Sequence, residues 1–201
     1  MLAKRLAFTH IDTGALYRGV ALLALRAGAR ADDEKAVVDA AKGAKFEFRQ
    51  LVDGNLLHID GVCVHKDIRT EQVSALASKV SALPGVRQLL LGLQRRLGQE
   101  GGVVLEGRDI GTVVFPGAEV KVFLTASIEA RAKRRALELA AKGELVDLER
   151  VKIEMAQRDK QDSERAVAPL KQAPDAELVD TSTMSIDSVL DRLESLVKQR
   201  S

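Results

Sequence analysis

The chain has 201 residues, of which 46% are hydrophobic and 3% aromatic, with a formal net charge of +2 and no tryptophan. The small net charge excludes an overall electrostatic attraction to nucleic acid or anionic lipid. The low aromatic content leaves little surface on which single-stranded nucleic acid could stack. A single cysteine, Cys63, excludes an internal disulfide framework and a cysteine-based zinc site, as suits a reducing cytoplasm. No apolar run approaches the ~20 residues that span a bilayer, and the N-terminus lacks a hydrophobic signal core. We therefore expect one soluble, cytoplasmic domain over residues 1–201.

The N-terminal part of the chain is predicted to be mostly helical. Apolar and basic residues from Leu2 to Ala7 are typical of an amphipathic helix that is already under way. Residues 8–12, "FTHID", predict a short strand, and a Thr-Gly turn leads from it into an Ala/Leu-rich helix over residues 15–27. A second helix is expected from about Asp32 to Lys42, because two acidic residues at its start suit the positive end of a helix dipole.

The pattern then changes to three short β-type runs, "KFEFRQL", "NLLHID" and "VCVHKD". Asp53-Gly54 and Asp60-Gly61 separate these runs, and Asp-Gly between such runs is a strong hairpin signal. Residues 43–68 are therefore predicted to form an inserted antiparallel subdomain of three strands.

Two helices and two strands are predicted after this subdomain. The helices cover about residues 71–82 and 85–99, with a break at Pro84. The runs "GGVVLEG" and "AEVKVFLTA" are continuously apolar, which is typical of strands buried on both faces of a parallel sheet.

The C-terminal part begins with a charged helical pair over residues 127–142 and 147–163, with Gly143 as the expected C-cap of the first helix. The run "AELVDTS" predicts a last short strand, and residues 186–198 predict a closing amphipathic helix. Because strands alternate with helices, we expect an α/β fold with a parallel sheet.

Charged residues follow one of the predicted buried strands, in the sequence Glu106-Gly107-Arg108-Asp109. Ligands bind at the carboxyl ends of the strands in open α/β sheets, which favours a functional role. An ion pair that caps the strand explains the same residues equally well.

Arg158, Asp162 and Arg165 are spaced i, i+4 and i+7, which places them on one face of a predicted helix. Taken alone, such a run more often forms a solvated, salt-bridged surface than a binding site. The sequence leaves both interpretations open.

Arg131, Arg134 and Arg135 share the face of another predicted helix. Three guanidinium groups on one face repel one another unless an anion lies among them, and the arginine fork suits phosphate. A phosphate ligand is favoured over a nucleic-acid patch, because the stretch is short and contains no aromatic residue.

Further arginines occur near predicted helix starts, at Arg18 beside Tyr17 and at Arg87. No Gly-x-Ser-x-Gly elbow is present. An arginine-rich α/β chain without a nucleophile of its own fits phosphoryl transfer, in which a protein mainly positions reactants and neutralises charge. The three histidines are scattered, so that no metal site is expected from them: His10, His58 and His65.

Five segments resemble the bacterial cytidylate kinases in order and spacing: "HIDTGALYRGVAL", "IRTEQVSALASKVSALPGVR", "GRDIGTVVFPGAEVKVFLTAS", "ARAKRR" and "RDKQDSERAVAPL". The resemblance covers nearly the whole chain and implies transfer of the ATP γ-phosphate to CMP or dCMP, with Mg²⁺. It implies a parallel sheet flanked by helices, an inserted subdomain on the CMP side and a helical lid over residues 127–165. A monomer that binds neither nucleic acid nor membrane is expected.

The resemblance also implies roles for individual residues on the CMP side. Arg18 and Arg108 would hold the CMP phosphate, in a pocket that Asp12, Thr13 and Tyr17 line. Three further residues would recognise the cytosine, since a carboxylate accepts from its exocyclic amine and arginine donates to its ring acceptors: Ser78, Arg87 and Asp109.

In the same way, Asp162 would bond the ribose hydroxyl, and Arg158 and Arg165 would approach the phosphates. The lid arginines would close over ATP and neutralise the transferring group together with Arg158: Arg131, Arg134 and Arg135.

One departure from the family concerns the phosphate loop. The family begins with a buried strand and the motif Gly-x-x-x-x-Gly-Lys-[Ser/Thr], and this motif does not occur in the 201 residues. We expect a start codon assigned too late rather than a truncated, inactive chain. Without that strand, the "VVLEG" and "VKVFL" strands would have unpaired backbone groups between them. A non-catalytic CMP-binding remnant, a kinase for UMP or AMP, and an RNA-binding role remain alternatives.

Overall fold

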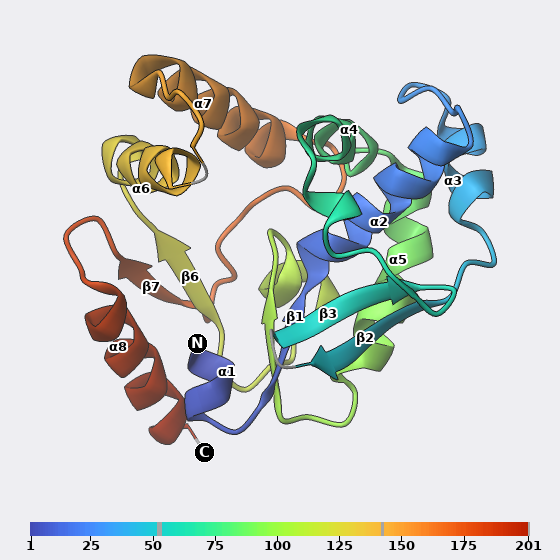
Figure 1. The fold of residues 1–201 in the computed structure, drawn as a ribbon. Coiled ribbons are helices and arrows are strands. Elements are labelled where there is room, and N and C mark those ends of the chain that lie inside the picture. Colours follow the sequence, from blue (N-terminus) through green and yellow to red (C-terminus); the bar gives the residue numbers. More distant parts are fainter. Residues whose placement is uncertain (52–53, 142, 201) are drawn as a thin grey trace. The chain divides into compact units, whose positions relative to one another are not determined.

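The computed structural model describes residues 1–51, 54–141 and 143–200. The chain divides into two compact units, one of Met1–Leu2 with Gly111–Ser201 and one of Ala3–Ile110. Helices and strands alternate along both units, and the strands form parallel pairs and one small antiparallel sheet (Figure 1). The fold is therefore α/β, as the sequence predicts. No helix among the described residues has the length and apolar character that crossing a membrane requires.

The unit of residues 3–110 is built around the long helix α2. Its elements are α1 (Leu2–Arg5, shared with the other unit), β1 (Thr9–Asp12), α2 (Thr13–Arg26), α3 (Glu34–Ala41), β2 (Phe46–Leu51), β3 (Gly54–Ile59), β4 (Val62–Cys63), η1 (Asp67–Arg69), α4 (Glu71–Val80), α5 (Pro84–Gly98) and β5 (Val103–Glu106). Leu16, Val20 and Ala24 recur at helical spacing along α2 and are fully buried. They form one core with apolar residues of α3, α4, α5 and β3.

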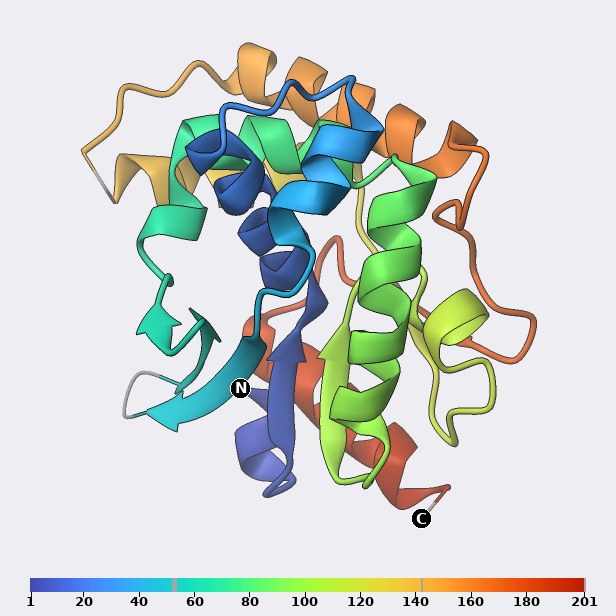
Figure 2. The same ribbon diagram turned by 90° about the vertical axis from the view of Figure 1, so that its right-hand side faces the viewer.

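Strands β1 and β5 pair in parallel, with Asp12 opposite Glu106 at their carboxyl ends. Helix α2 begins at the same point, because the Asp12 side chain accepts a hydrogen bond from the Ala15 amide and caps the helix. Helix α5 runs alongside the strand pair in the same unit (Figure 2). One edge of this unit therefore holds two strand ends and a helix N-terminus, the place where α/β folds bind ligands.

The inserted antiparallel sheet is confirmed, with strand order β2-β3-β4. Asp60 and Gly61 make its second turn, both with positive φ (51° and 81°), which Asp-Gly pairs tolerate. The first predicted turn includes Asp53, which lies outside the described residues.

The other unit contains a second parallel pair of strands with three helices. Its elements are η2 (Ile110–Val114, a π-type turn shared with the other unit), β6 (Val122–Thr125), α6 (Ile128–Ala140), α7 (Leu148–Glu164), β7 (Glu177–Asp180) and α8 (Ile186–Lys198). Ser127, Asp147 and Ser185 cap the three helices through side-chain hydrogen bonds, so that the predicted helical pair and closing helix are confirmed.

Three local predictions are corrected. The opening helix ends at Arg5 instead of Ala7, because Ala7 adopts a positive φ of 55°. The C-cap of α6 is Ala141, and Gly143 follows it with φ +81° and donates to the Ala140 carbonyl. The predicted helix end at Lys142 lies outside the described residues.

The prediction that β5 and β6 are buried on both faces is wrong. Their residues are half-buried or exposed, and Leu124 on β6 keeps 53% of its surface. Within the described residues each strand belongs to a sheet of only two strands, so one of its long edges has no neighbouring strand to cover it. An apolar run thus indicated strand formation but not the degree of burial.

Candidate functional site

The carboxyl ends of β1 and β5 bring together the first group of predicted site residues. Arg18, on the first turns of α2, pairs with the Asp12 carboxylate at 2.5 Å. The Thr13 hydroxyl donates to the Glu106 carbonyl at 2.6 Å and so ties the start of α2 to the end of β5. Among the described residues, the buried Nε of Arg18 has no hydrogen-bond partner. Arg18 therefore carries a donor that a ligand could satisfy.

The segment after β5 passes very close to this helix start, and Gly107 makes the approach possible. A Cβ at Gly107 would lie 2.5 Å from the Thr13 hydroxyl oxygen and 2.9 Å from the Ile110 side chain. Real side chains do not tolerate such distances, so only glycine fits here. The next residue, Arg108, is exposed at the rim of this turn.

The second group centres on a buried ion pair between Arg87 of α5 and Asp109. Arg87 also donates to the Ser81 carbonyl at 3.0 Å, and its guanidinium lies 5.4 Å from the centre of the Tyr17 ring. Ser78 is half-buried on α4, where its carbonyl accepts from the Ser81 hydroxyl. Hydrogen bonds through Ser81 therefore link the backbone carbonyl of Ser78 to Arg87, whose pair with Asp109 is buried.

His10 also belongs to this edge, although no role was predicted for it from the sequence. Its Nε2 lies 3.3 Å from the Glu106 carboxylate. The hydrogen bond to Glu106 raises the pKa of His10, and the same bond lowers the pKa of Glu106. The alternation of side chains along a strand, with His10 two residues before Asp12, was a signal that could have found it.

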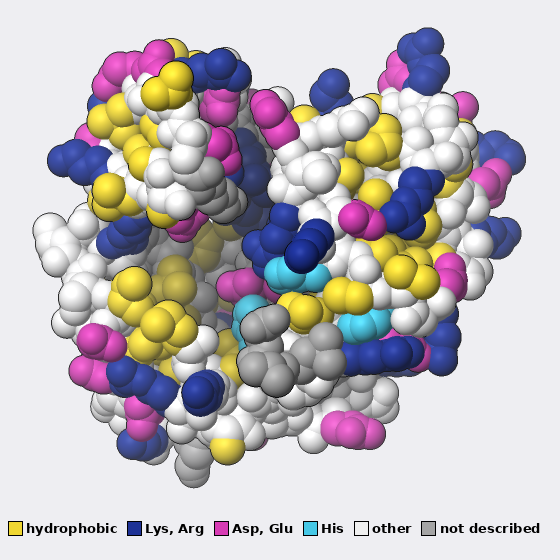
Figure 3. Space-filling model, in the orientation of Figure 1, with side chains coloured by type: hydrophobic (Ala, Val, Ile, Leu, Met, Phe, Trp, Pro, Cys, Tyr) yellow, Lys and Arg dark blue, Asp and Glu magenta, His cyan; other side chains and the backbone are white. Residues whose placement is uncertain are grey.

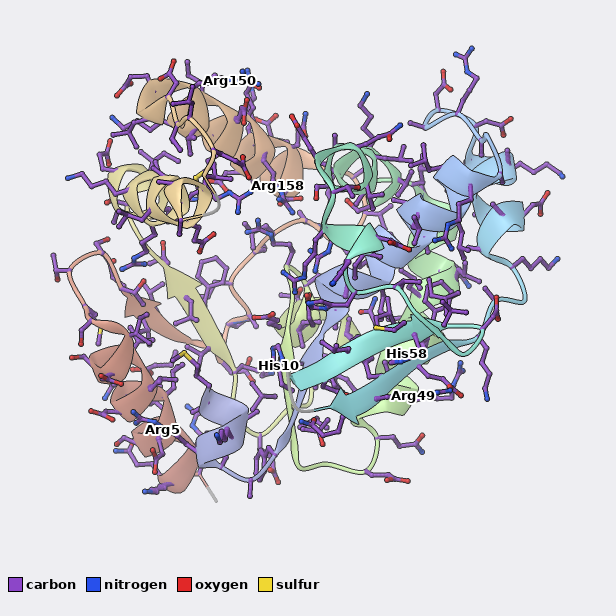
Figure 4. All side chains as sticks on the ribbon, viewed as in Figure 1. Arg5, His10, Arg49, His58, Arg150 and Arg158 are labelled. Carbon is purple, nitrogen blue, oxygen red and sulfur yellow. The ribbon has the colours of Figure 1, made fainter. Side chains whose placement is uncertain are left out.

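The other histidine of the sheets, His58, lies on β3, whereas His10 lies on β1 (Figure 4). Its Nδ1 is within hydrogen-bond distance of the Leu56 carbonyl. The described residues contain no group of three or more His, Cys, Asp or Glu side chains that could hold a metal ion.

The unit of residues 111–201 holds the arginines predicted to form a lid. Their guanidinium groups were expected to repel one another unless an anion lies among them, but acidic groups and carbonyls of the same unit already contact all three. Arg131 pairs with Asp159 at 2.7 Å, Arg134 donates to the hydroxyl of Thr181 at 3.2 Å and to its carbonyl, and Arg135 pairs with Glu138 at 3.2 Å.

The prediction that Arg158, Asp162 and Arg165 share one helix face is wrong for Arg165, because α7 ends at Glu164 and Arg165 has an extended backbone. The cluster is also only partly a solvated surface. Asp162 is 9% exposed and pairs with Arg165 at 3.4 Å. Arg165 also donates from Nε to the Ala168 carbonyl at 2.6 Å. Arg158 lies one turn before Asp162, is largely exposed, and approaches its carboxylate to 4.0 Å (Figure 4). Basic and acidic side chains are interspersed over the face shown in Figure 3, which agrees with the small net charge.

The chain matches known proteins over nearly its whole length. A family model described as "Cytidylate kinase" matches residues 1–199. A protein of Citrifermentans bemidjiense named "Cytidylate kinase" is 50% identical over 202 residues, which cover all of this chain and 86% of that protein. Proteins with the same name from Syntrophotalea carbinolica and Geobacillus sp. (strain WCH70) are 52% and 46% identical, over 85% and 89% of their lengths and 99% and 100% of this chain.

Proposed function

This chain belongs to the cytidylate kinase family, and we propose that it transfers the γ-phosphate of ATP to CMP or dCMP, giving CDP or dCDP. The observation that carries the residue assignments is the polar edge formed by β1, β5 and α2, where a buried guanidinium nitrogen has a hydrogen to donate. An arginine at the carboxyl ends of parallel strands, beside a helix N-terminus, suits a phosphate group.

The CMP phosphate is proposed to bind Arg18 and Arg108. Arg18 is already oriented by Asp12, and its Nε adds a donor that the described residues leave unsatisfied. Thr13 and Tyr17 line the same pocket. Asp12 holds Arg18 in place and caps α2. Little rearrangement is therefore needed when the phosphate binds.

The cytosine is proposed to bind around Arg87 and Asp109, with Ser78 nearby. The Asp109 carboxylate would accept a hydrogen bond from the exocyclic amine of cytosine, which the carbonyl of uracil cannot donate. Because this carboxylate is buried, a base that cannot donate a hydrogen bond to it would lose more binding free energy than it would in water. The site should therefore discriminate strongly against UMP.

In the other unit, Asp162 is proposed to bond the ribose hydroxyl, with Arg158 and Arg165 directed to the phosphates. Arg131, Arg134 and Arg135 are proposed to neutralise charge on the transferring group, exchanging some of their present partners for phosphate oxygens. Of the three, Arg135 should lose the least free energy on leaving its present partner, because Glu138 is largely exposed.

Cytidylate kinases use ATP and Mg²⁺, and both are proposed here as donor and cofactor. The described residues offer no cluster of three potential ligands for the ion, and no Gly-x-x-x-x-Gly-Lys-[Ser/Thr] occurs in the 201 residues. The described residues alone therefore do not make a fitting site for the metal ion, and no step is assigned through it.

The test is a coupled kinase assay with CMP, dCMP, UMP and AMP as acceptors. It is run on the 201-residue chain beside the same chain extended upstream to the next in-frame start codon. Turnover of CMP and dCMP far ahead of UMP and AMP supports the proposal. Equal or faster turnover of UMP or AMP would identify a related kinase instead.

A non-catalytic CMP-binding protein is the alternative of a different class. It would show a higher melting temperature with CMP but no consumption of ATP in either form of the chain. For the enzyme we propose a cytoplasmic monomer, as suits small diffusible substrates, and gel filtration with and without CMP tests the oligomeric state.

A further inference from the structure

Gln94 is a buried polar residue that none of the proposed roles uses. It lies on α5 and keeps only 1% of its surface exposed, among the largest fully buried side chains. Burying an amide group is unfavourable unless it makes hydrogen bonds. An apolar residue would fill this position without that cost, so the contacts of Gln94 call for an explanation.

The contact of Gln94 is with the hydroxyl of Tyr17 on α2. Its Nε2 lies 3.4 Å from the Tyr17 oxygen and donates to it. Gln94 follows Arg87 by seven residues, so the two side chains leave α5 from the same face, two turns apart. Arg87 stacks over the ring of Tyr17 at 5.4 Å. The two buried polar residues of α5 therefore contact a single tyrosine, one at its ring face and one at its hydroxyl.

These contacts extend the network around the buried ion pair. Arg87 is anchored by Asp109 and by the Ser81 carbonyl. Tyr17 has few torsions, and contacts at both its face and its end define the position of the ring. Loss of the Gln94 contact would remove the hydrogen bond that Gln94 donates to the hydroxyl end of the ring. A shift of the ring would then disturb the guanidinium that stacks on it.

We propose that Gln94 is a positioning residue of the nucleotide pocket, which holds the Tyr17 hydroxyl so that the ring and the Arg87 guanidinium keep the geometry that binds CMP. This inference rests on the proposed function, since it takes CMP as the ligand. It assigns Gln94 no contact with the nucleotide itself.

The sequence supplies a direct probe of this contact. Tyr17 is the single tyrosine of the chain and there is no tryptophan, so tyrosine fluorescence reports on Tyr17 alone. In Gln94→Met, which keeps the length of the side chain but has no donor, we expect Tyr17 to be quenched more readily by acrylamide than in the unaltered chain. Gln88→Met is the matched control, because Gln88 is exposed on the same helix.

The functional measurement is CMP affinity by calorimetry. We expect Gln94→Met to raise the Kd for CMP about 5- to 10-fold, which corresponds to one hydrogen bond. Tyr17→Phe should have a similar effect, and the double variant should be no worse than either single variant, since both changes remove the same contact. Gln88→Met should leave the Kd unchanged. Gln94→Glu, with a planar end group that donates when protonated, should bind CMP more tightly than Gln94→Met.

Two results would overturn the inference: a Kd for Gln94→Met within twofold of the unaltered chain, or multiplying effects in the double variant. If Gln94→Met does not fold, Tyr17→Phe is compared with the unaltered chain instead, and equal CMP affinity of these two proteins overturns the inference. Failure of the proposed function is a different observation, namely no heat of CMP binding to the unaltered chain.

Discussion

The guanidinium of Arg87 donates to the carboxylate of Asp109 although both side chains are more than nine-tenths buried. Taking two opposite charges out of water is costly, and their attraction offsets that cost only where further hydrogen bonds complete the pair. Arg87 has such support from the Ser81 carbonyl and the Tyr17 ring. The pair is therefore a preorganised set of donors and acceptors at the proposed cytosine site.

Asp109→Ala should destabilise the protein strongly, because it leaves the Arg87 charge buried and without its partner. We expect the free energy of unfolding to fall by about 3–5 kcal/mol in urea denaturation. The double variant Arg87→Met with Asp109→Leu should recover most of this loss while failing to bind CMP. A loss below about 1 kcal/mol in Asp109→Ala would contradict the buried pair.

Gly107→Ala should damage the pocket through backbone crowding alone. The new Cβ would meet the Thr13 hydroxyl and displace the strand end to which it bonds. We expect a loss of about 1–3 kcal/mol in stability and weaker CMP binding by calorimetry. Gly117→Ala is the control, because a Cβ there meets nothing within 4 Å. Equal behaviour of the two variants would show that the close approach is unimportant.

Arg18→Lys keeps a positive charge beside Asp12 but removes the Nε donor and the planar fork. We expect the Kd for CMP to rise about tenfold, because an ammonium group cannot replace two parallel hydrogen bonds to a phosphate. The affinity for cytidine, which carries no phosphate, should be unaltered. If cytidine and CMP weaken equally in this variant, Arg18 does not bind the phosphate.

The arginines of α6 should separate into a structural and a functional member. Arg134 joins α6 to Thr181 beyond β7, so Arg134→Ala should lower the free energy of unfolding by about 1–3 kcal/mol. Arg135 pairs with the exposed Glu138, so Arg135→Ala should change the free energy of unfolding by less than about 0.5 kcal/mol. Thermal and urea unfolding of the two variants, measured side by side, test this order; the reverse order would refute it.

The His10–Glu106 pair should give stability a pH dependence. The pKa of His10 is raised in the folded protein. Its contribution to the free energy of unfolding is therefore complete below the unfolded histidine pKa of about 6.5, and it disappears as pH rises through the folded pKa. The folded pKa of Glu106 is lowered, so the contribution is present above about pH 4.3 and disappears as pH falls through the folded value.

We therefore expect His10→Gln to destabilise the protein at about pH 5.5 and to have no effect at about pH 9. The difference should not exceed about 1 kcal/mol, because both side chains are substantially exposed. Urea denaturation of both proteins at the two pH values measures it. A difference that is independent of pH would mean that the pair does not form.

Local periodicity and capping chemistry were sufficient to predict most of the secondary structure. The closing helix was predicted over residues 186–198 and found there, because its apolar spacing and the Ser185 cap act within a few residues. The antiparallel insertion was predicted from Asp60-Gly61, whose positive φ angles are a local property of that turn. The resemblance to the cytidylate kinases likewise depended on the order of residues along the chain, and the family match confirmed it.

Only the tertiary structure decided which charges meet. His10 is distant from Glu106 in the sequence, and parallel pairing of β1 with β5 brings them together. The sequence pattern likewise did not reveal that Arg134 bonds Thr181, or that β5 and β6 remain half-exposed. Side-chain periodicity reports which face of an element is apolar, whereas ion pairs and burial depend on distant segments that the fold places alongside it.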